Sequence, residues 1–112
     1  MIIKKSERKK YENSPTCIAY EYEIKDKDIN IALIEINGRY PESGKVINKI
    51  CKEIAIVIKG DGKVGIDDKE FSISEGDSIF IQPNQKFFWE GNLILAMSCH
   101  PAFYPEQHVE CE

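Results

Sequence analysis

The chain has 112 residues, a hydrophobic fraction of 42% and a formal net charge of -4. This length predicts one domain spanning residues 1–112, and the hydrophobic fraction excludes a disordered chain. The negative charge argues against nucleic acid or an anionic membrane as a partner, and no apolar run approaches the ~20 residues of a transmembrane helix. The first residues lack the apolar core of a secretory signal, so we expect a cytoplasmic protein.

Residues 1–15 read as an N-terminal arm with a short basic run, ending at Ser14-Pro15. The segment 16–24 alternates in polarity, with apolar or aromatic residues at Ile18, Tyr20 and Tyr22, and this alternation predicts a strand. A second strand is predicted over 29–36 and closes at Asn37-Gly38. The segment 38–44 is rich in turn formers and predicts a loop.

Two residues of this loop are candidate ligand contacts, because loops on a rigid barrel often carry binding residues. Arg39 offers a guanidinium for a carboxylate or phosphate, and Tyr40 offers a ring with a hydroxyl tip. The alternative is a surface ion pair for Arg39 and a covering role for Tyr40 at the barrel end.

The segment 52–92 contains closely spaced strand signals. Ile54–Ile58 is short and rich in β-branched residues, which predicts a strand buried on both faces. Gly60-Asp61-Gly62 after it predicts a hairpin turn. Further short strands are predicted over residues 63–66, 70–73, 78–81, 86–90 and 93–97. This rhythm predicts an all-β sandwich or barrel.

Several turn residues resemble the two motifs of the cupin superfamily. Glu53, followed by six residues and Gly60, is similar to the second half of the first motif. Glu75-Gly76-Asp77 and Pro83 are similar to the second motif, with Asn84 in the place of a glycine, a position where asparagine tolerates the left-handed conformation. The resemblance implies an all-β, double-stranded β-helix or jelly-roll barrel of the small, sugar-isomerase-like kind.

The resemblance also implies a metal site of three histidines and a glutamate, and this chain departs from it. The first two histidine positions fall on Ile47 and Lys49, or on Val46 and Asn48 with a spacing one residue longer, and the third falls on Phe87. Glu53 alone remains, and one carboxylate does not hold a transition metal. We therefore expect no standard metal centre and no cofactor. An unconventional site of Glu53 with Cys51, Cys99 or His100 stays open.

A strand alternates its side chains, so the residues that share a face with Glu53 can be inferred. Lys49, Cys51, Ala55 and Val57 are expected beside Glu53, and Phe87 and Trp89 opposite. The candidate ligand-binding residues are Arg39, Tyr40, Lys49, Cys51, Glu53, Phe87 and Trp89. Burial would raise the pKa of Glu53 and suit it to general acid or base catalysis, or Glu53 is a structural carboxylate.

The cysteines and the C-terminal segment 100–112 complete the expectations. Cys17, Cys51 and Cys99 are interpreted as small buried side chains and Cys111 as a tail thiol. The tail is expected to pack on the barrel without forming strand or helix, because it contains Pro101 and Pro105. We expect His100 near the pocket mouth and His108 in solvent.

Three functions remain open. The first is metal-independent binding of a small polar, sugar-like ligand. The second is an isomerase or epimerase that uses Glu53 as general acid or base, with or without an unconventional metal. The third is a structural subunit whose barrel is filled by its own side chains. A homodimer is expected from the resemblance and from the exposed sheet edges of so small a barrel.

Overall fold

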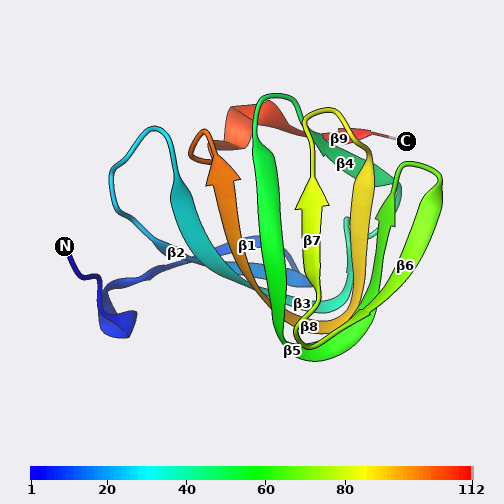
Figure 1. Ribbon diagram of the computed structural model, residues 1–112, viewed down its shortest axis with the longest axis horizontal. Coiled ribbons are helices and arrows are strands. Elements are labelled where there is room, and N and C mark those ends of the chain that lie inside the picture. Colours follow the sequence, from blue (N-terminus) through cyan, green and yellow to red (C-terminus); the bar gives the residue numbers. More distant parts are fainter. Residues whose placement is uncertain (112) are drawn as a thin grey trace.

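The computed structural model describes residues 1–111, which form one curled antiparallel sheet of nine strands and two short 3-10 helices (Figure 1). The elements are η1 (Lys5–Glu7), β1 (Lys9–Ser14), β2 (Cys17–Tyr22), β3 (Asn30–Tyr40), β4 (Lys45–Asn48), β5 (Lys52–Ile66), β6 (Lys69–Ser74), β7 (Ser78–Ile81), β8 (Phe87–His100), η2 (Pro105–Gln107) and β9 (His108–Cys111). The predicted all-β, barrel-like fold is confirmed. Within the described residues, no helix is long and apolar enough to cross a membrane.

Strand β8 lies at the centre of the sheet. It pairs with β3 on one side and with β5 on the other along almost its full length. Beyond β3 the order continues through β2 to β1, and β5 pairs with β7 near its start and with β6 near its end. Strand β4 contacts the beginning of β8 and pairs with β9. Figure 1 shows the long strands β3, β5 and β8 bending over at the lower edge of the view.

Three strand ends predicted at glycines are wrong, because the chain continues through each of them. Gly38 on β3, Gly91 on β8 and Gly62 on β5 lie in one row across three adjacent strands. A Cβ on Gly62 would lie 2.1 Å from the carbonyl oxygen of Glu90, and one on Gly91 would lie 2.6 Å from the Cα of Gly62. Only glycine permits this close approach. The row is the crease at which the sheet folds over.

Two short turns do follow the sequence. Asp67, between β5 and β6, has a φ of 54°, and Asn84, between β7 and β8, has a φ of 68°. Both residues have a left-handed backbone conformation, which was predicted for Asn84 because it occupies the position of a glycine in the motif. Asp67 also joins the two turns, because its Oδ1 accepts from the Lys86 backbone N–H at 3.0 Å.

The prediction that Ile54–Ile58 is buried on both faces is wrong. Ala55 and Val57 are buried, but Ile54, Ile56 and Ile58 are 53%, 43% and 50% exposed on the outer face. A run of β-branched residues cannot tell a strand covered on both faces from a strand with an apolar outer face. The first half of β5 is the second kind.

The inner face of β2 carries the residues that lie between Ile18, Tyr20 and Tyr22. Its inward residues are Cys17, Ala19 and Glu21, whereas Ile18, Tyr20 and Tyr22 are half-buried on the outer side. The Arg8 guanidinium covers the Tyr20 ring at 3.9 Å, which gives this outer aromatic a partner. Small inward side chains leave open space inside the curl.

Both ends of the chain join the sheet. Residues 9–14 of the expected arm form β1, which pairs with β2. The tail contains η2 and the strand β9, so the expectation that its prolines exclude strand and helix is wrong. Pro105 begins η2, where a missing N–H costs nothing, and β9 starts three residues later. Strand β9 pairs with β4 and brings the tail against the open end of the barrel.

Candidate ligand-binding pocket

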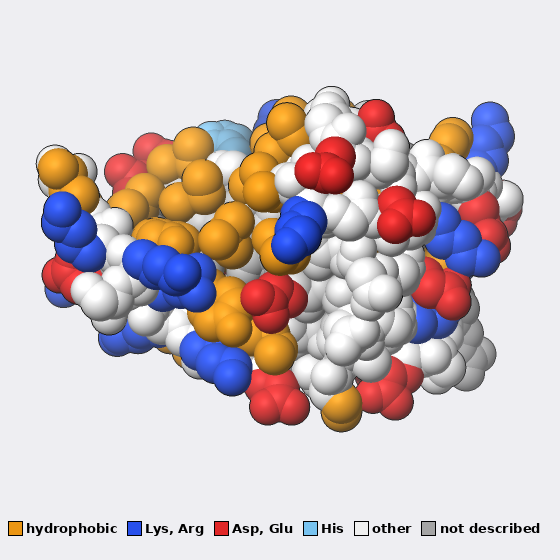
Figure 2. Space-filling model, turned by 90° about the horizontal axis from the view of Figure 1, so that it is seen from below, with side chains coloured by type: hydrophobic (Ala, Val, Ile, Leu, Met, Phe, Trp, Pro, Cys, Tyr) orange, Lys and Arg blue, Asp and Glu red, His pale blue; other side chains and the backbone are white. Residues whose placement is uncertain are grey.

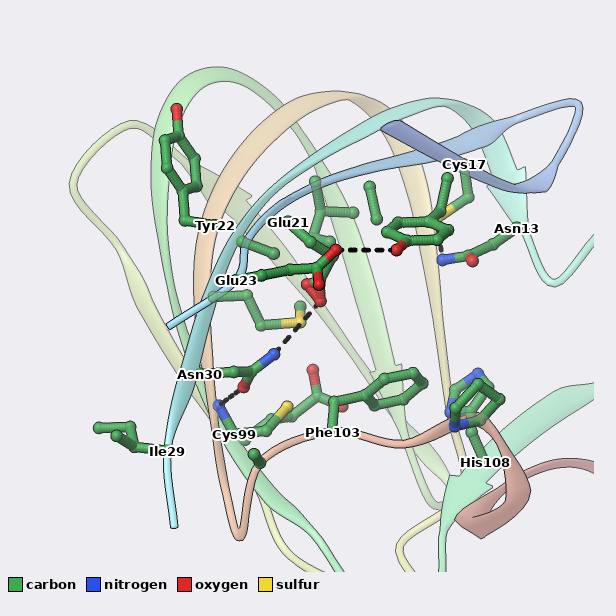
Figure 3. Close-up of a pocket in the computed structure, with 18 of the residues that line it drawn as sticks. Asn13, Cys17, Glu21, Tyr22, Glu23, Ile29, Asn30, Cys99, Phe103 and His108 are labelled. Carbon is green, nitrogen blue, oxygen red and sulfur yellow. Dashed lines mark hydrogen bonds between the residues drawn. The ribbon is translucent and has the colours of Figure 1, made fainter. Parts of the chain in front are cut away.

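A cavity of about 420 Å³ opens between the two halves of the curled sheet. Its walls come from the inner faces of β2, β3 and β8, from the segment that follows β2, and from the tail that holds Phe103 and His108. Figure 3 shows these side chains around the open space. Small-molecule sites occupy ~300–1,000 Å³, so the cavity fits a small organic ligand. A barrel filled by its own side chains does not agree with this cavity.

Three aromatic rings beyond the crease form one wall. Tyr40 pairs with Trp89 across β3 and β8, and Phe87 lies two positions away on the same face. The Phe87 and Trp89 rings meet edge to face, with centroids 6.5 Å apart and an interplanar angle of 78°. This wall offers a ligand an apolar, polarisable surface.

The opposite wall carries a carboxylate at each end. One row across the sheet runs Glu21, Ala32, Met97 and Ala55, and the next runs Asn30, Cys99 and Glu53. Glu21 on β2 and Glu53 on β5 are therefore separated by three strand spacings of ~4.8 Å, with small or flexible side chains between them. A ligand on this surface meets an acidic group at both ends.

Glu53 is buried, with 5% of its surface exposed. Asn48 Nδ2 donates a hydrogen bond to its Oε1. Burial raises the pKa of Glu53 to about 7, against the opposing effect of the Asn48 hydrogen bond. The carboxyl is thus poised to gain or lose a proton near neutral pH.

The buried polar side chains among residues 1–111 are Asn48, Glu53 and Gln107, and all belong to one hydrogen-bond network. Gln107 Oε1 accepts from the backbone N–H groups of Ile50 and Cys51 at 3.2 and 3.0 Å, which fixes the orientation of its amide. Gln107 Nε2 then donates to Asn48 Oδ1 at 3.1 Å. Asn48 Oδ1 is therefore the acceptor, and its Nδ2 must be the group that faces Glu53.

The same logic assigns the tautomer of His108. Its Nδ1 lies 2.8 Å from Asn48 Oδ1, an acceptor, so Nδ1 carries the proton. Nε2 of the neutral ring is then an acceptor, and the Tyr40 hydroxyl donates to it at 2.8 Å. Burial lowers the pKa of His108 and raises that of Tyr40, so both stay neutral at physiological pH.

The end of the pocket beside β2 is built differently. Asn30 Nδ2 donates to Glu21 Oε1 at 3.3 Å, and Asn30 Oδ1 accepts from the Cys99 backbone N–H at 2.9 Å. Glu21 Oε2 is buried and has no hydrogen-bond partner among the described residues. Burial raises the pKa of Glu21, Asn30 opposes the rise, and the nearby Glu23 adds to it. Figure 3 shows Glu21 and Glu23 extending into the pocket above Asn30.

Four of the seven sequence-derived ligand contacts line the cavity, namely Tyr40, Glu53, Phe87 and Trp89. The other three lie elsewhere. Arg39 covers the Phe88 ring at 4.1 Å and donates to the Pro41 carbonyl oxygen at 2.7 Å. Lys49 is exposed, so its expected place beside Glu53 is wrong. Cys51 is buried, but its Sγ donates to the Pro101 carbonyl oxygen at 3.2 Å and does not line the cavity.

The two histidines exchange their expected places. His100 is exposed, and its Nδ1 donates to the Asp28 carbonyl oxygen at 2.7 Å, away from the cavity. His108 is half-buried, lines the cavity and packs beside Phe103 with ring centroids 5.6 Å apart. The strand β9, which the two prolines seemed to exclude, carries His108 inward.

Sequence reasoning did not select Asn48, Gln107 or Glu21 as site residues. The alternation of β2 contains a signal for Glu21, because Cys17, Ala19 and Glu21 share one face. Asn48 was one of two positions offered by the uncertain motif spacing. Gln107 gave no signal, because its role depends on the approach of the tail to the turn before β5.

The metal ligands implied by the fold do not fit this site. Val46 and Asn48 are the buried residues of β4, so the longer motif spacing is correct, and Val46 pairs with Phe87. The donor positions therefore carry valine, asparagine and phenylalanine around Glu53. Among residues 1–111, no group of three histidine, cysteine, aspartate or glutamate side chains is arranged to hold a metal ion. Asn48 bonds the carboxylate instead.

No protein-family model and no curated protein matches the chain. Solved structures do match it. Pac13 from Streptomyces, a nucleoside dehydratase, has a TM-score of 0.89 at 14% identity, covering 100% of this chain and 91% of its own. KdgF from a Halomonas species scores 0.73 at 13% identity, covering 92% and 94%. An RmlC-like cupin from Shewanella frigidimarina scores 0.72 at 17% identity, covering 87% and 86%. At these identities the matches show a shared fold.

Proposed function

We propose that this chain, a small cupin-type barrel, binds a small polar organic ligand with a flat ring or sugar. The observation that carries the proposal is the cavity of about 420 Å³ with an aromatic wall facing a carboxylate at each end. Tyr40, Phe87 and Trp89 would contact the ring of the ligand. Glu53 Oε1 is occupied by Asn48, which leaves its Oε2 to accept from a ligand hydroxyl or amine.

Uridine is the first ligand to test, because structures of Pac13 variants hold uridine in a barrel of the same fold. Trp89 is the only tryptophan of the sequence and lines the cavity, so its fluorescence reports occupancy directly. Uridine and a panel of monosaccharides should be titrated with excitation of Trp89 alone. We expect saturable binding of at least one compound, weakened about tenfold or more by Glu53→Gln.

The matched control is Glu75→Gln, an exposed glutamate of the turn before β7. It should leave binding unchanged. If Glu53→Gln binds the same compound as tightly as the unmodified protein, Glu53 does not contact the ligand. If no nucleoside or sugar binds at millimolar concentration, the proposal is wrong.

A second function is proton transfer by Glu53. Its support is the buried carboxyl with a pKa of about 7. Glu53 would take a proton from the carbon beside a ligand carbonyl to give an enediol. An isomerase returns that proton to the former carbonyl carbon while the hydroxyl proton passes between the two oxygens, and an epimerase returns a proton to the same carbon from the other face. NMR in deuterium oxide would detect exchange of that carbon-bound proton in aldoses and ketoses. Exchange should disappear in Glu53→Gln and persist in Glu75→Gln, whereas exchange that persists in both contradicts the role.

For assembly, we propose a homodimer through the outer face of β5 and β7. Ile54 pairs with Phe80 across these strands, and together with Ile56 and Ile58 they form an exposed apolar row. Figure 2 shows that hydrophobic side chains gather in one area of the face seen from below. Contiguous exposed apolar surface marks an interface, and a second copy is the usual partner.

Sedimentation tests the dimer. Ile56→Lys should convert it to a monomer at micromolar concentration. Ile50→Lys, at an equally exposed isoleucine in the turn before β5, should not. A monomeric unmodified protein would contradict the proposal.

We also propose a cytoplasmic location, supported by four cysteines that are free thiols.

A further inference from the structure

The charges that line the pocket are unbalanced. Its acidic residues are Glu21, Glu23, Asp26 and Glu53, and its basic residue is Lys25, exposed at the rim. His108 is held neutral by its donor and acceptor partners. The wall around Glu21 is therefore negatively charged, and no cationic side chain among residues 1–111 lies inside the cavity.

Glu21 is the centre of this imbalance. Asn30 bonds only its first oxygen: the Asn30 amide nitrogen donates to Oε1, and the Asn30 carbonyl accepts from the Cys99 backbone N–H. Oε2 is left buried and unpartnered within residues 1–111. Such an oxygen loses its water without gaining a donor, which is costly for a folded protein. A ligand donor in the cavity that Glu21 lines would remove that cost once the side chain turns Oε2 toward it.

Glu23 places a second carboxylate near Glu21. Its Oε1 accepts from the Tyr11 hydroxyl at 3.0 Å and lies 3.4 Å from Lys9 Nζ. The Lys9 and Glu23 side chains are 64% and 41% exposed, so solvent weakens this pair, and Glu23 adds an exposed carboxylate close to Glu21. Figure 3 shows the Glu21 and Glu23 side chains reaching into the pocket from the same strand region.

We propose that this end of the pocket binds an ammonium group, so that the ligand is an amine whose N–H groups donate to Glu21 and whose ring lies toward the aromatic wall. The inference rests on the proposed ligand binding and names its chemical class. An ammonium supplies several donors and the missing positive charge together, whereas a hydroxyl supplies one donor and no charge. A phosphate or carboxylate here would meet two carboxylates and be repelled.

The test uses two series matched in size and differing in charge. The first is 5'-amino-5'-deoxyuridine, uridine and uridine 5'-monophosphate. The second is benzylamine, benzyl alcohol and benzoate, which carries no assumption about a nucleoside. Each is titrated at neutral pH with Trp89 fluorescence as the readout. We expect the amine of at least one series to bind about tenfold tighter than its neutral partner, and the anion to be weakest.

Glu21→Gln is the variant that probes the site, because glutamine keeps an acceptor for Asn30 and removes the charge. It should abolish the preference for the amine over the neutral compound while leaving binding of the neutral compound within about twofold. The control is Glu35→Gln on β3, which does not line the cavity and should keep the preference. Circular dichroism verifies that each variant is folded.

The outcomes separate the two proposals. Neutral compounds that bind as tightly as amines, or anions that bind best, overturn the ammonium site and leave ligand binding intact. A preference for amines that survives Glu21→Gln also overturns it. If none of the six compounds binds, ligand binding as proposed fails, and the ammonium site fails with it.

Discussion

The two carboxylates of the pocket occupy opposite kinds of environment. Around Glu53 the carboxylate accepts from Asn48, and the network through Asn48, Gln107 and His108 is fixed in orientation by two backbone N–H groups. Around Glu21 one buried oxygen has no partner within residues 1–111. Both glutamates face the same cavity, so burial alone does not explain the difference.

The difference separates the structural part of the site from the part open to a ligand. A satisfied buried network holds its members in one arrangement and is costly to break. An unsatisfied buried group weakens the folded protein until something binds it. The network behind Glu53 therefore holds the pocket in shape and leaves one oxygen of Glu53 for a ligand, whereas Glu21 has a buried oxygen that no described residue bonds.

The largest effect on stability should follow from removal of the Gln107 amide, which anchors the hydrogen-bond network behind Glu53. Gln107→Leu leaves the Ile50 and Cys51 backbone N–H groups without their acceptor and removes a donor from Asn48. The Cys51 N–H is buried and the Ile50 N–H is partly buried, and an orphaned buried donor costs ~1–3 kcal/mol, so we expect a loss of about 3 kcal/mol in the free energy of unfolding. Urea denaturation measures it.

Gln82→Leu is the control for this substitution, because Gln82 is exposed. It should change the free energy of unfolding by less than about 0.5 kcal/mol. A loss below about 1 kcal/mol for Gln107→Leu would mean that water replaces the amide, and that the network does not fix the shape of the pocket.

The second effect is a pH dependence that Glu53 imposes. Its pKa is about 7 in the folded protein against 4.5 in the unfolded chain, so the folded state holds a proton that the unfolded state has lost between these values. Stability contributed by this group is fully present below about pH 4.5 and is lost as pH rises through about 7. The total amounts to about 3 kcal/mol.

Glu53→Gln should remove this dependence, because glutamine keeps an acceptor for Asn48 and does not ionise. The variant should be more stable than the unmodified protein by about 3 kcal/mol at pH 8 and by less than about 1 kcal/mol at pH 5. Glu21 contributes the same sign and His108 the opposite one, since its lowered pKa costs stability as pH falls below 6.5. Comparison of the two proteins cancels both. A constant difference across pH would contradict the raised pKa.

The sequence predicts features that depend on neighbouring residues better than features that depend on contacts between distant strands. The all-strand character and the left-handed turn at Asn84 depend on neighbouring residues and were predicted correctly, and the inward direction of Glu53 was expected from the resemblance to cupins. The glycines were misread as turns, because the row formed by Gly38, Gly62 and Gly91 exists only once three strands lie side by side. A crease and a turn have the same local signal.

The site shows the same limit. Glu53, Phe87 and Trp89 followed from alternation within strands that the motif had already located. Gln107 and His108 lie more than fifty residues from Glu53 in the sequence. They approach it because β9 pairs with β4, and no local sequence pattern predicts this pairing. The unpartnered oxygen of Glu21 depends on how Asn30 divides its two groups, which only the folded arrangement reveals.

The smallest effect tests the unsatisfied end. Glu21→Gln replaces a buried, unpartnered carboxylate oxygen by a neutral amide, so the unliganded protein should become more stable by about 1 kcal/mol at pH 8. Glu35→Gln should change stability by less than about 0.5 kcal/mol. Thermal or urea unfolding at pH 8 measures both. A variant less stable than the unmodified protein would mean that Glu21 already has a partner, such as bound water, and that the two ends of the pocket are alike. A gain in stability would show that Glu21 is kept at a cost to the folded protein, which is the expected property of a residue whose partner is a ligand.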